Sequence, residues 1–281
     1  MHDLGDLEKL DRAVSARARL LDRIHRLGYE TAVKALDIGP LNLPFMHIAD
    51  PDRVLDRVAE EQDRLEKIQG RTSASSVEPT SASSLRLSSA SKTVEARTPG
   101  DQLHLPYWAE LWDSGLAIGA WLTENDSLLP DSPPSVLDLG CGMGLAGTVA
   151  ARLGMRVLFA DLEAPALLFA RLNSLPDAAR VRTRCLNWRH DRLDETFDLI
   201  IGADSLYERE QWDFLEPFWR AHLKPRGILL LGEPGRQTGD AFPQWIEQRG
   251  GWVLRQHARR VPTRAVPIRL FELRQKENAP D

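Results

Sequence analysis

Residues 136–147 read Val-Leu-Asp-Leu-Gly-Cys-Gly-Met-Gly-Leu-Ala-Gly, and this run constrains the fold more than any other part of the chain. A short apolar segment carries the carboxylate of Asp138, and glycines then alternate at Gly140, Gly142 and Gly144. Glycines let the backbone turn tightly and approach a ligand closely, because a side chain at those positions would collide with it. A strand, a glycine loop and a helix in succession predict an α/β domain with a ligand at the loop.

Two classes of ligand fit this loop. Residues 142–147 satisfy Gly-x-Gly-x-x-Gly, a pattern that brings a pyrophosphate to the N-terminus of a helix. The carboxylate of Asp138 would repel a pyrophosphate, whereas it suits the amino acid end of S-adenosylmethionine. The glycine alternation also begins one step too early for the dinucleotide pattern. We therefore favour a methyl-donor site, with a nucleotide site and an ordinary glycine-rich turn as the alternatives.

A second acidic residue follows the next expected strand, at residues 156–160. Asp161 lies 23 residues after Asp138, about the separation of successive strand ends in a β-α-β unit. A carboxylate at this place can hold both ribose hydroxyls of an adenosine-containing cofactor. The alternative is that Asp161 caps the helix expected from residue 164, as Asp commonly does. The position therefore supports a ligand that contains adenosine, but it does not distinguish a methyl donor from a nucleotide cofactor.

Composition limits the classes of function. The 281 residues, 42% of them apolar, suffice for one α/β domain and an appendage. The net charge of −5 provides no strongly basic field, so a nucleic-acid substrate is not expected. No apolar run approaches the length of a membrane span, and the N-terminus lacks a signal-peptide core. Because Cys141 and Cys185 have no metal-ligand spacing, we expect a reduced cytoplasmic protein without a metal site.

Three zones follow one another along the chain. Residues 1–70 predict a helical extension, with an apolar helical stripe over residues 6–27 and a second helix behind it. Residues 71–102 predict a flexible linker, because serine recurs nine times over residues 73–91 and apolar residues are few. Residues 103–281 predict the α/β domain.

This domain is expected to form a doubly wound, mostly parallel sheet of seven strands. Continuous apolar runs such as residues 228–231 suit strands that are buried on both faces. The last two strands are too close in sequence for a crossover helix and should form an antiparallel hairpin at the edge of the sheet. Strands are expected at residues 136–139, 157–160, 199–203, 228–231, 252–256 and 268–273. Helices are expected at about residues 114–124, 145–153, 164–174, 210–223 and 241–249.

Four further motifs surround the glycine loop: residues 106–115, Asn187-Trp188, residues 198–207 with Asp-Ser-Leu-Tyr, and the Gly-Glu-Pro-Gly-Arg of residues 232–236. Together they resemble the seven-strand, class I (Rossmann-like) protein methyltransferases of the family 16 type. The likeness is greatest to the lysine methyltransferases of the electron-transfer flavoprotein β subunit and their bacterial relatives. It covers about residues 103–274.

The resemblance implies S-adenosylmethionine as cofactor. The loop glycines would line its methionine portion, Asp161 would hold the ribose, and Trp188 and Ala203 would flank the adenine. Trp112 would also pack against the cofactor, whereas Trp108 is expected in the core. The residues expected to bind the cofactor are Trp112, Asp138, Gly140, Cys141, Gly142, Gly144, Asp161, Trp188 and Ala203.

Asp204 and Tyr207 are the candidate catalytic residues. The resemblance implies that they form an Asp-x-x-Tyr signature beside the transferable methyl group. A lysine amine must lose its proton before it attacks, and its unperturbed pKa is about 10.4. A carboxylate with an aromatic neighbour can orient the amine and stabilise the charge that develops on nitrogen. The alternative is that Asp204 only caps the helix expected at residues 210–223.

The function expected from these motifs is N-methylation of a lysine side chain on a protein substrate, by a monomeric enzyme that needs no membrane. Methylation of a small amine or a pyridine nitrogen is the alternative within enzymes. A third possibility is an inactive cofactor-binding domain that works as an interaction module. The glycine loop, Asp161 and the pair of Asp204 and Tyr207 argue against inactivity, because a non-catalytic domain does not need all of them.

Overall fold

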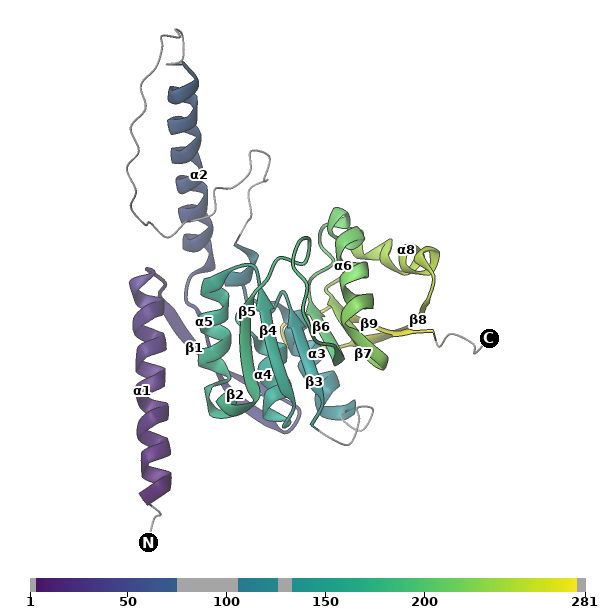
Figure 1. Ribbon diagram of the computed structural model, residues 1–281, viewed down its shortest axis with the longest axis horizontal. Helices are drawn as coiled ribbons and strands as arrows, with labels where there is room; N and C mark the ends of the chain where they lie inside the picture. The colour runs from purple at the N-terminus through teal and green to yellow at the C-terminus, as the bar shows by residue number, and fades with distance from the viewer. Residues whose placement is uncertain (1–3, 75–105, 126–132, 277–281) are drawn as a thin grey trace. The chain divides into compact units, whose positions relative to one another are not determined.

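The computed structural model describes residues 4–74, 106–125 and 133–276 (Figure 1). The chain forms two compact units, of which one holds residues 1–49 and 108–281 and the other holds residues 50–107. The first 49 residues therefore belong to the same unit as the α/β domain. Of the linker expected at residues 71–102, only residues 71–74 are described, at the end of a helix; the rest lies outside the described residues.

A seven-stranded sheet forms the centre of the larger unit, as predicted. Its strands are β3 (Ser135–Leu139), β4 (Arg156–Asp161), β5 (Val181–Cys185), β6 (Phe197–Ala203), β7 (Leu223–Glu233), β8 (Trp252–Arg259) and β9 (Ile268–Gln275). Their spatial order is β5-β4-β3-β6-β7-β9-β8. All neighbours are parallel except the pairs that β9 forms with β7 and β8. The mostly parallel sheet and the antiparallel final hairpin are confirmed, and β9 lies between β7 and β8.

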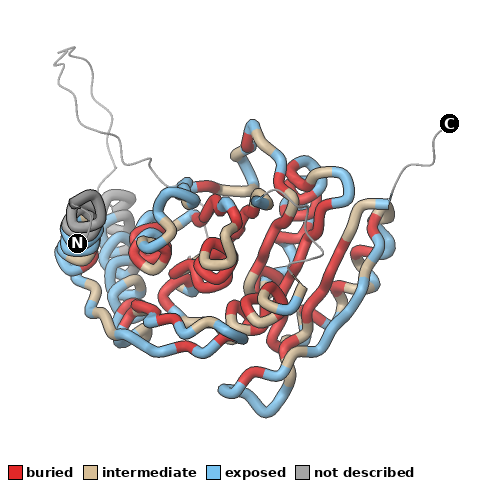
Figure 2. The backbone as a smooth tube through the Cα atoms, turned by 90° about the horizontal axis from the view of Figure 1, so that it is seen from below, coloured by how far each residue is buried: buried red, intermediate tan, exposed pale blue. Residues whose placement is uncertain are grey.

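Helices cover both faces of this sheet. The helices of the domain are α3 (Asp113–Asn125), α4 (Leu145–Arg152), α5 (Ala164–Asn173), α6 (Arg209–His222), α7 (Gln237–Asp240) and α8 (Phe242–Arg249), with 3-10 turns at Tyr107–Ala109 and Leu175–Arg180. Successive side chains of a strand face opposite sides. Leu137 therefore packs in one core with Trp212 of α6 and Phe242 of α8, whereas Asp138 points towards α4. Figure 2 shows that buried residues follow the strands and the inner sides of these helices.

A helix and a β-hairpin precede the sheet in the same unit. They are α1 (Leu4–Arg26), β1 (Thr31–Ile38) and β2 (Leu41–Ile48), and the two strands pair antiparallel along their whole length. Asn173 at the end of α5 holds the hairpin: it accepts a hydrogen bond from the Met46 N–H (2.8 Å) and donates to the carbonyls of Met46 (3.0 Å) and Met143 (3.1 Å). Phe45 and Ile48 are each 1% exposed. The hairpin is therefore part of the core, although the sequence reading placed only helices here.

The smaller unit contains helix α2 (Pro51–Ala74). Asp50 accepts a hydrogen bond from the Arg53 N–H (3.3 Å), and Pro51 occupies the first turn. An aspartate before the helix and a proline at its start stabilise a helix N-terminus. The second helix predicted for the N-terminal extension is confirmed.

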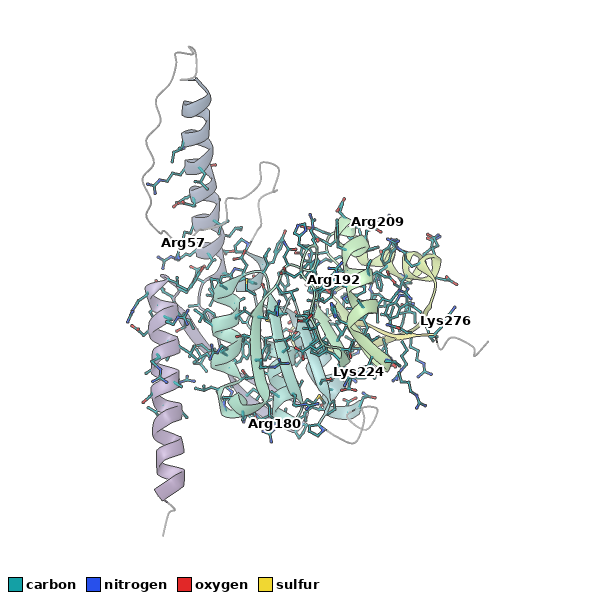
Figure 3. The ribbon with its side chains drawn as sticks, viewed as in Figure 1. Arg57, Arg180, Arg192, Arg209, Lys224 and Lys276 are labelled. Carbon is teal, nitrogen blue, oxygen red and sulfur yellow. The ribbon has the colours of Figure 1, made fainter. Side chains whose placement is uncertain are left out.

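A polar cluster ties three strands together at their amino ends. The carboxylate of Asp198 in β6 accepts hydrogen bonds from the N–H (2.9 Å) and hydroxyl (2.7 Å) of Ser135 in β3. Lys224 in β7 pairs with the same carboxylate at 2.8 Å. Arg180 and Lys224 lie on this side of the sheet, whereas Arg192 and Arg209 lie on the side of the carboxyl ends (Figure 3).

The two outer strands of the sheet are rich in arginine. β5 carries Arg182 and Arg184, and β8 carries Arg255 and Arg259. Both strands have few buried residues. Arg182 pairs with Glu195, and Arg259 pairs with Glu124, each at 2.7 Å.

Candidate functional site

The candidate site lies at the carboxyl edge of the sheet, where the chain order reverses between β3 and β6. Open α/β sheets bind ligands at such a switch point. Asp138 lies in β3, Asp161 ends β4 and Asp204 directly follows β6. The fold therefore brings the three predicted carboxylates to one edge.

The glycine loop wraps the end of β4. Gly140 and Gly142 have φ of +67° and +52°, a left-handed backbone that favours glycine. The N–H groups of Gly140 and Cys141 donate to the Ala160 carbonyl at 2.8 and 3.1 Å. The Gly142 N–H donates to the Asp161 carboxylate at 2.8 Å. These bonds fix the loop directly against the second predicted carboxylate.

Asp138 is a buried carboxylate with one oxygen engaged. It is 1% exposed, and its Oδ2 accepts a hydrogen bond from the Gly147 N–H at 2.8 Å. Its Oδ1 is buried and has no hydrogen-bond partner among the described residues. Burial raises the pKa of Asp138 to about 7; the Gly147 N–H opposes this increase and the charge of Asp161 adds to it. A buried polar atom without a partner points to a missing ligand, and an ammonium group suits this oxygen.

Asp161 is held by the backbone on both oxygens. Besides the bond from Gly142, its Oδ1 accepts a hydrogen bond from the Glu163 N–H at 2.9 Å. Asp161 is 8% exposed, and burial raises its pKa to about 6 in spite of these two donors. Glu163, and not Asp161, occupies the N-cap position of α5. Asp161 therefore shapes the turn before the helix, and its remaining lone pairs are free to accept bonds from ribose hydroxyls.

Trp188 lies beside the glycine loop. A Cβ added to Gly140 would lie 3.6 Å from the Trp188 ring, so the ring is within van der Waals reach of the loop. The Trp188 Nε1–H donates to Gln211 in α6 at 3.1 Å, which fixes the ring plane. A Cβ at Gly144 would instead meet Ala170 in α5 at 2.7 Å. Gly144 therefore allows α4 to pack against α5. This packing role was not part of the prediction, which gave Gly144 only a role in cofactor binding.

Asp204 has an unusual backbone and a buried side chain. Its φ is +56°, its N–H donates to the Gly232 carbonyl of β7 at 2.8 Å, and it is 6% exposed. Burial raises its pKa, and the guanidinium of Arg236 opposes that increase. Glu208 occupies the N-cap of α6, so Asp204 does not cap this helix. Strained backbone of this kind concentrates at functional sites. The partly buried Tyr207 stands three residues further along the same loop.

Arg236, the last residue of the Gly-Glu-Pro-Gly-Arg motif, pairs with an acidic residue that the sequence alone did not identify. Its Nε and Nη2 donate to the two oxygens of Asp204 at 3.1 and 3.0 Å. Its Cζ lies 5.2 Å from the centre of the Trp112 ring, a cation–π contact. The guanidinium of Arg236 therefore contacts both Asp204 and Trp112. An arginine 32 residues away from an aspartate gives no local pattern, although the Gly-Glu-Pro-Gly-Arg motif does mark the turn.

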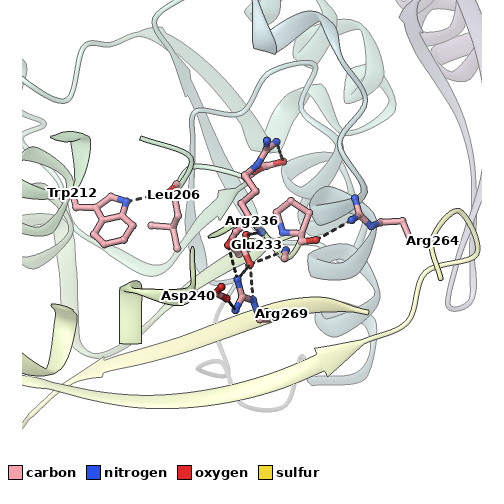
Figure 4. Close-up of polar contacts among 10 residues, drawn as sticks. Leu206, Trp212, Glu233, Arg236, Asp240, Arg264 and Arg269 are labelled. Atoms are coloured by element: carbon pink, nitrogen blue, oxygen red, sulfur yellow. Dashed lines mark hydrogen bonds and ion pairs between the residues drawn. The ribbon is translucent and has the colours of Figure 1, made fainter. Parts of the chain in front are cut away.

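A buried glutamate holds the turn that carries Arg236 (Figure 4). Glu233, 1% exposed at the end of β7, accepts hydrogen bonds from the N–H groups of Gly235 and Arg236. It also pairs with Arg269 of β9, which in turn pairs with Asp240. The backbone of the turn is thus fixed independently of the Arg236 side chain.

The loop between β8 and β9 reaches the same edge of the sheet. Arg264 donates to the Pro234 carbonyl at 2.9 Å and lies 3.9 Å from Asp113, the first residue of α3. The Thr263 hydroxyl donates to Asp113 at 2.6 Å. Because Asp113 follows Trp112, this loop borders the site next to the aromatic ring.

The remaining predicted residues divide between site and core. Ala203 is the last residue of β6 and pairs with Gly232 of β7. Cys141 is partly buried in the glycine loop, and burial raises the pKa of its thiol. Trp108 packs edge-on against Tyr29 with ring centres 5.2 Å apart, which confirms its expected core position.

Within residues 4–74, 106–125 and 133–276, no group of His, Cys, Asp and Glu side chains could hold a metal ion. None of the helices described there has the length and apolar content needed to cross a bilayer.

Comparison with known proteins gives matches in one family. Residues 107–244 match the family described as lysine methyltransferase. The chain is 35% identical over 147 residues to protein N-lysine methyltransferase METTL21A of Xenopus tropicalis, covering 50% of this chain and 66% of that protein. It is 29% identical to the electron transfer flavoprotein beta subunit lysine methyltransferase of Homo sapiens, covering 62% and 61%. It is also 29% identical to histone-arginine methyltransferase METTL23 of Rattus norvegicus, covering 43% and 55%.

The matched stretches span about half to two thirds of these relatives' own lengths. Among solved structures, the glycopeptide N-methyltransferase MtfA complexed with S-adenosyl-L-homocysteine aligns with a TM-score of 0.49 and 15% identity. This alignment covers 59% of this chain and 91% of that chain.

Proposed function

We propose that the chain is an S-adenosylmethionine-dependent N-methyltransferase that acts on protein lysines, in line with the match of residues 107–244 to the lysine methyltransferase family. The observation that carries the proposal is the set of three buried carboxylates at one sheet edge, of which Asp138 keeps an oxygen without a partner. The names of METTL21A and of the flavoprotein-specific relatives support a protein acceptor.

The cofactor would lie along the glycine loop. S-adenosylmethionine supplies an activated methyl group on a sulfonium sulfur. The free oxygen of Asp138 would take its ammonium group, and the lone pairs of Asp161 would accept bonds from the ribose hydroxyls. Trp188 and Ala203 would border the adenine. Because ionised carboxylates are the better acceptors for both groups, we expect cofactor affinity to fall as the pH drops below about 7, the pKa of Asp138, and to fall further below about 6, the pKa of Asp161.

Asp204 and Tyr207 would serve the acceptor amine. Methyl transfer is a displacement in line with the leaving sulfur, so the enzyme acts mainly by aligning nucleophile and methyl group. The Asp204 carboxylate would orient the amine and stabilise the positive charge that develops on its nitrogen. Tyr207, on the same loop, would provide the aromatic neighbour.

Arginine is the second candidate acceptor, because one relative is named a histone-arginine methyltransferase. A small amine or a pyridine nitrogen is the third. We expect the enzyme to be monomeric and cytoplasmic. The two free cysteines, Cys141 and Cys185, fit the reducing environment of the cytoplasm.

The acceptor is identified by incubating a lysate from cells that lack the enzyme with the purified protein and radiolabelled S-adenosylmethionine. We expect a labelled protein band that yields methyllysine on acid hydrolysis. Methylarginine would support the second candidate, and label in a small metabolite would contradict a protein acceptor.

The same assay tests Asp204. Asp204→Asn keeps the shape of the side chain but removes the charge that would stabilise the developing ammonium. Loss of one such electrostatic contact typically lowers turnover on the order of 10²–10³-fold. We expect the variant to bind S-adenosylmethionine normally by calorimetry and to lose methyl transfer by this factor. Asp194→Asn, at an exposed position, is the matched control. Full activity of Asp204→Asn would remove Asp204 from the chemistry.

A further inference from the structure

The Asp204 carboxylate already has a cationic partner within the protein. Arg236 binds both of its oxygens, and the same guanidinium makes a cation–π contact with the Trp112 ring. The Asp204 side chain is 4% exposed and the Arg236 side chain is 39% exposed. A planar guanidinium with two parallel bonds is held more rigidly than a lysine ammonium would be.

We propose that Arg236 is a positioning residue that neutralises Asp204, so that the acceptor site takes the substrate lysine as an uncharged amine. This inference rests on the proposed function. A lone carboxylate would attract the lysine as ammonium, the form that cannot attack a methyl group. A carboxylate that is already paired keeps lone pairs that accept an N–H of the amine and stabilise the charge that develops on its nitrogen, but it attracts a full ammonium group less strongly than an unpaired carboxylate does.

Further charges face this pair from two other places in the fold. Glu233 approaches from the end of β7, and Arg264 approaches from the loop between β8 and β9. Arg264 is itself near Asp113 of α3, and Glu233 is paired with Arg269 of β9. Each of these charges has an opposite partner, so Arg236 is the group that decides the net charge beside Asp204.

A purely structural role for the Arg236 guanidinium is the alternative. The turn from β7 does not require it, because the N–H groups of Gly235 and Arg236 are bound by Glu233. Replacing the side chain should therefore change the charge at Asp204 and leave the path of the backbone intact.

The test is the pH dependence of turnover in Arg236→Gln. The substrate is the purified acceptor protein that the labelling assay identifies. Without the guanidinium, Asp204 would itself pair with the lysine ammonium, and an opposite charge at this range raises the pKa of an amine by about 1–3 units. In a plot of kcat against pH, we expect the rising part of the curve to shift to higher pH by at least one unit. At pH 7 kcat should fall about tenfold or more without an increase in KM, and it should recover near pH 9.5.

Two further variants separate charge from packing. Arg236→Lys keeps the positive charge and should leave the rising part of the plot of kcat against pH close to its original position. Its kcat should be lower because the second hydrogen bond is lost. Arg249→Gln is the matched control: Arg249 is also 39% exposed, lies 5.0 Å from the Trp245 ring centre and pairs with an aspartate, Asp213. It should leave the profile unchanged. A kcat that falls equally at all pH values in Arg236→Gln would overturn the proposal.

A second measurement needs no acceptor. The Asp204 carboxyl carbon is followed by ¹³C NMR as the pH is varied, in the wild-type protein and in Arg236→Gln. Because the guanidinium opposes the effect of burial, its removal should raise the pKa of Asp204 by at least one unit. An unchanged pKa would overturn the inference even if methyl transfer is confirmed. Absence of any labelled product with the wild-type enzyme would instead refute the proposed function.

Discussion

Asp138 shows at the scale of one residue how a ligand site costs stability. Its pKa is raised to about 7 from 3.8, chiefly by burial. The folded protein therefore holds a proton that the unfolded chain has released, and its stability falls as the pH rises from about 4 to 7. Three pKa units correspond to a cost on the order of 4 kcal/mol for ionised Asp138 at neutral pH. A cationic ligand would offset this cost on binding.

The predicted consequence is that Asp138→Asn stabilises the ligand-free protein and weakens the binding of S-adenosylmethionine. The amide keeps an acceptor for the Gly147 N–H and carries no buried charge. In urea denaturation, the gain over wild type should be small at pH 4.5 and reach about 1–3 kcal/mol at pH 8. Calorimetry should show cofactor affinity reduced at least tenfold. A variant that is less stable than wild type at pH 8 would show that the charge of Asp138 is compensated within the protein.

At the scale of elements, the amino ends of β3, β6 and β7 depend on Asp198. Burial alone would raise the pKa of this carboxyl, but the bonds from Lys224 and Ser135 outweigh it and lower the pKa. Its stabilising contribution is therefore present above about pH 4, the ordinary range of an unfolded aspartate, and is lost as the pH falls through its lower folded value.

Asp198→Ala should lower the free energy of unfolding by about 1–3 kcal/mol at pH 7, because it leaves Lys224 and the Ser135 hydroxyl without this partner. Urea denaturation measures the loss, which should shrink below pH 4. The exposed Asp194→Ala serves as control and should change stability by less than about 0.5 kcal/mol. An equal effect of both variants would show that the cluster does not hold the strands.

The elements that the sequence predicted best are the buried ones. The runs that became β3, β4, β6 and β7 are mostly apolar, and their ends were located to within a few residues except at the polar start of β7. β5 was missed because Val-Arg-Thr-Arg-Cys has too few apolar residues for a recognisable strand. The hairpin of β1 and β2 was also missed, because half of β1 faces outward and Pro44 interrupts β2.

Part of the site was predictable because it lies next to the ends of these buried strands. Asp161 and the glycine loop adjoin strand ends, and the end of an apolar run in the sequence indicates where such a strand ends. The pairing of Asp204 with Arg236 follows from the register of β6 against β7, in which Ala203 lies opposite Gly232. No local pattern encodes a register between strands that a helix separates.

At the scale of the larger unit, α1 and the hairpin are part of the core that supports α5. Phe45 in β2 is 1% exposed, and Asn173 binds the backbone at the next residue. Phe45→Ala should therefore lower the unfolding free energy by about 3–5 kcal/mol and the melting temperature by about 6 °C or more. Val33→Ala, at a position 56% exposed in β1, should change neither by a measurable amount. A single thermal transition that is unaffected by Phe45→Ala would mean that the hairpin folds apart from the sheet.

The arginines of β5 and β8 bear on how these molecules behave at high concentration. An outer strand offers unpaired N–H and C=O groups along its free side, and a matching strand from another molecule can add there and begin a fibril. Growth at either end of this sheet would place the guanidinium groups of Arg182 and Arg184, or of Arg255 and Arg259, against a neighbouring strand. The cost of removing them from water opposes that growth. The charge on the two outer strands thus opposes the addition of strands from other molecules of the folded protein.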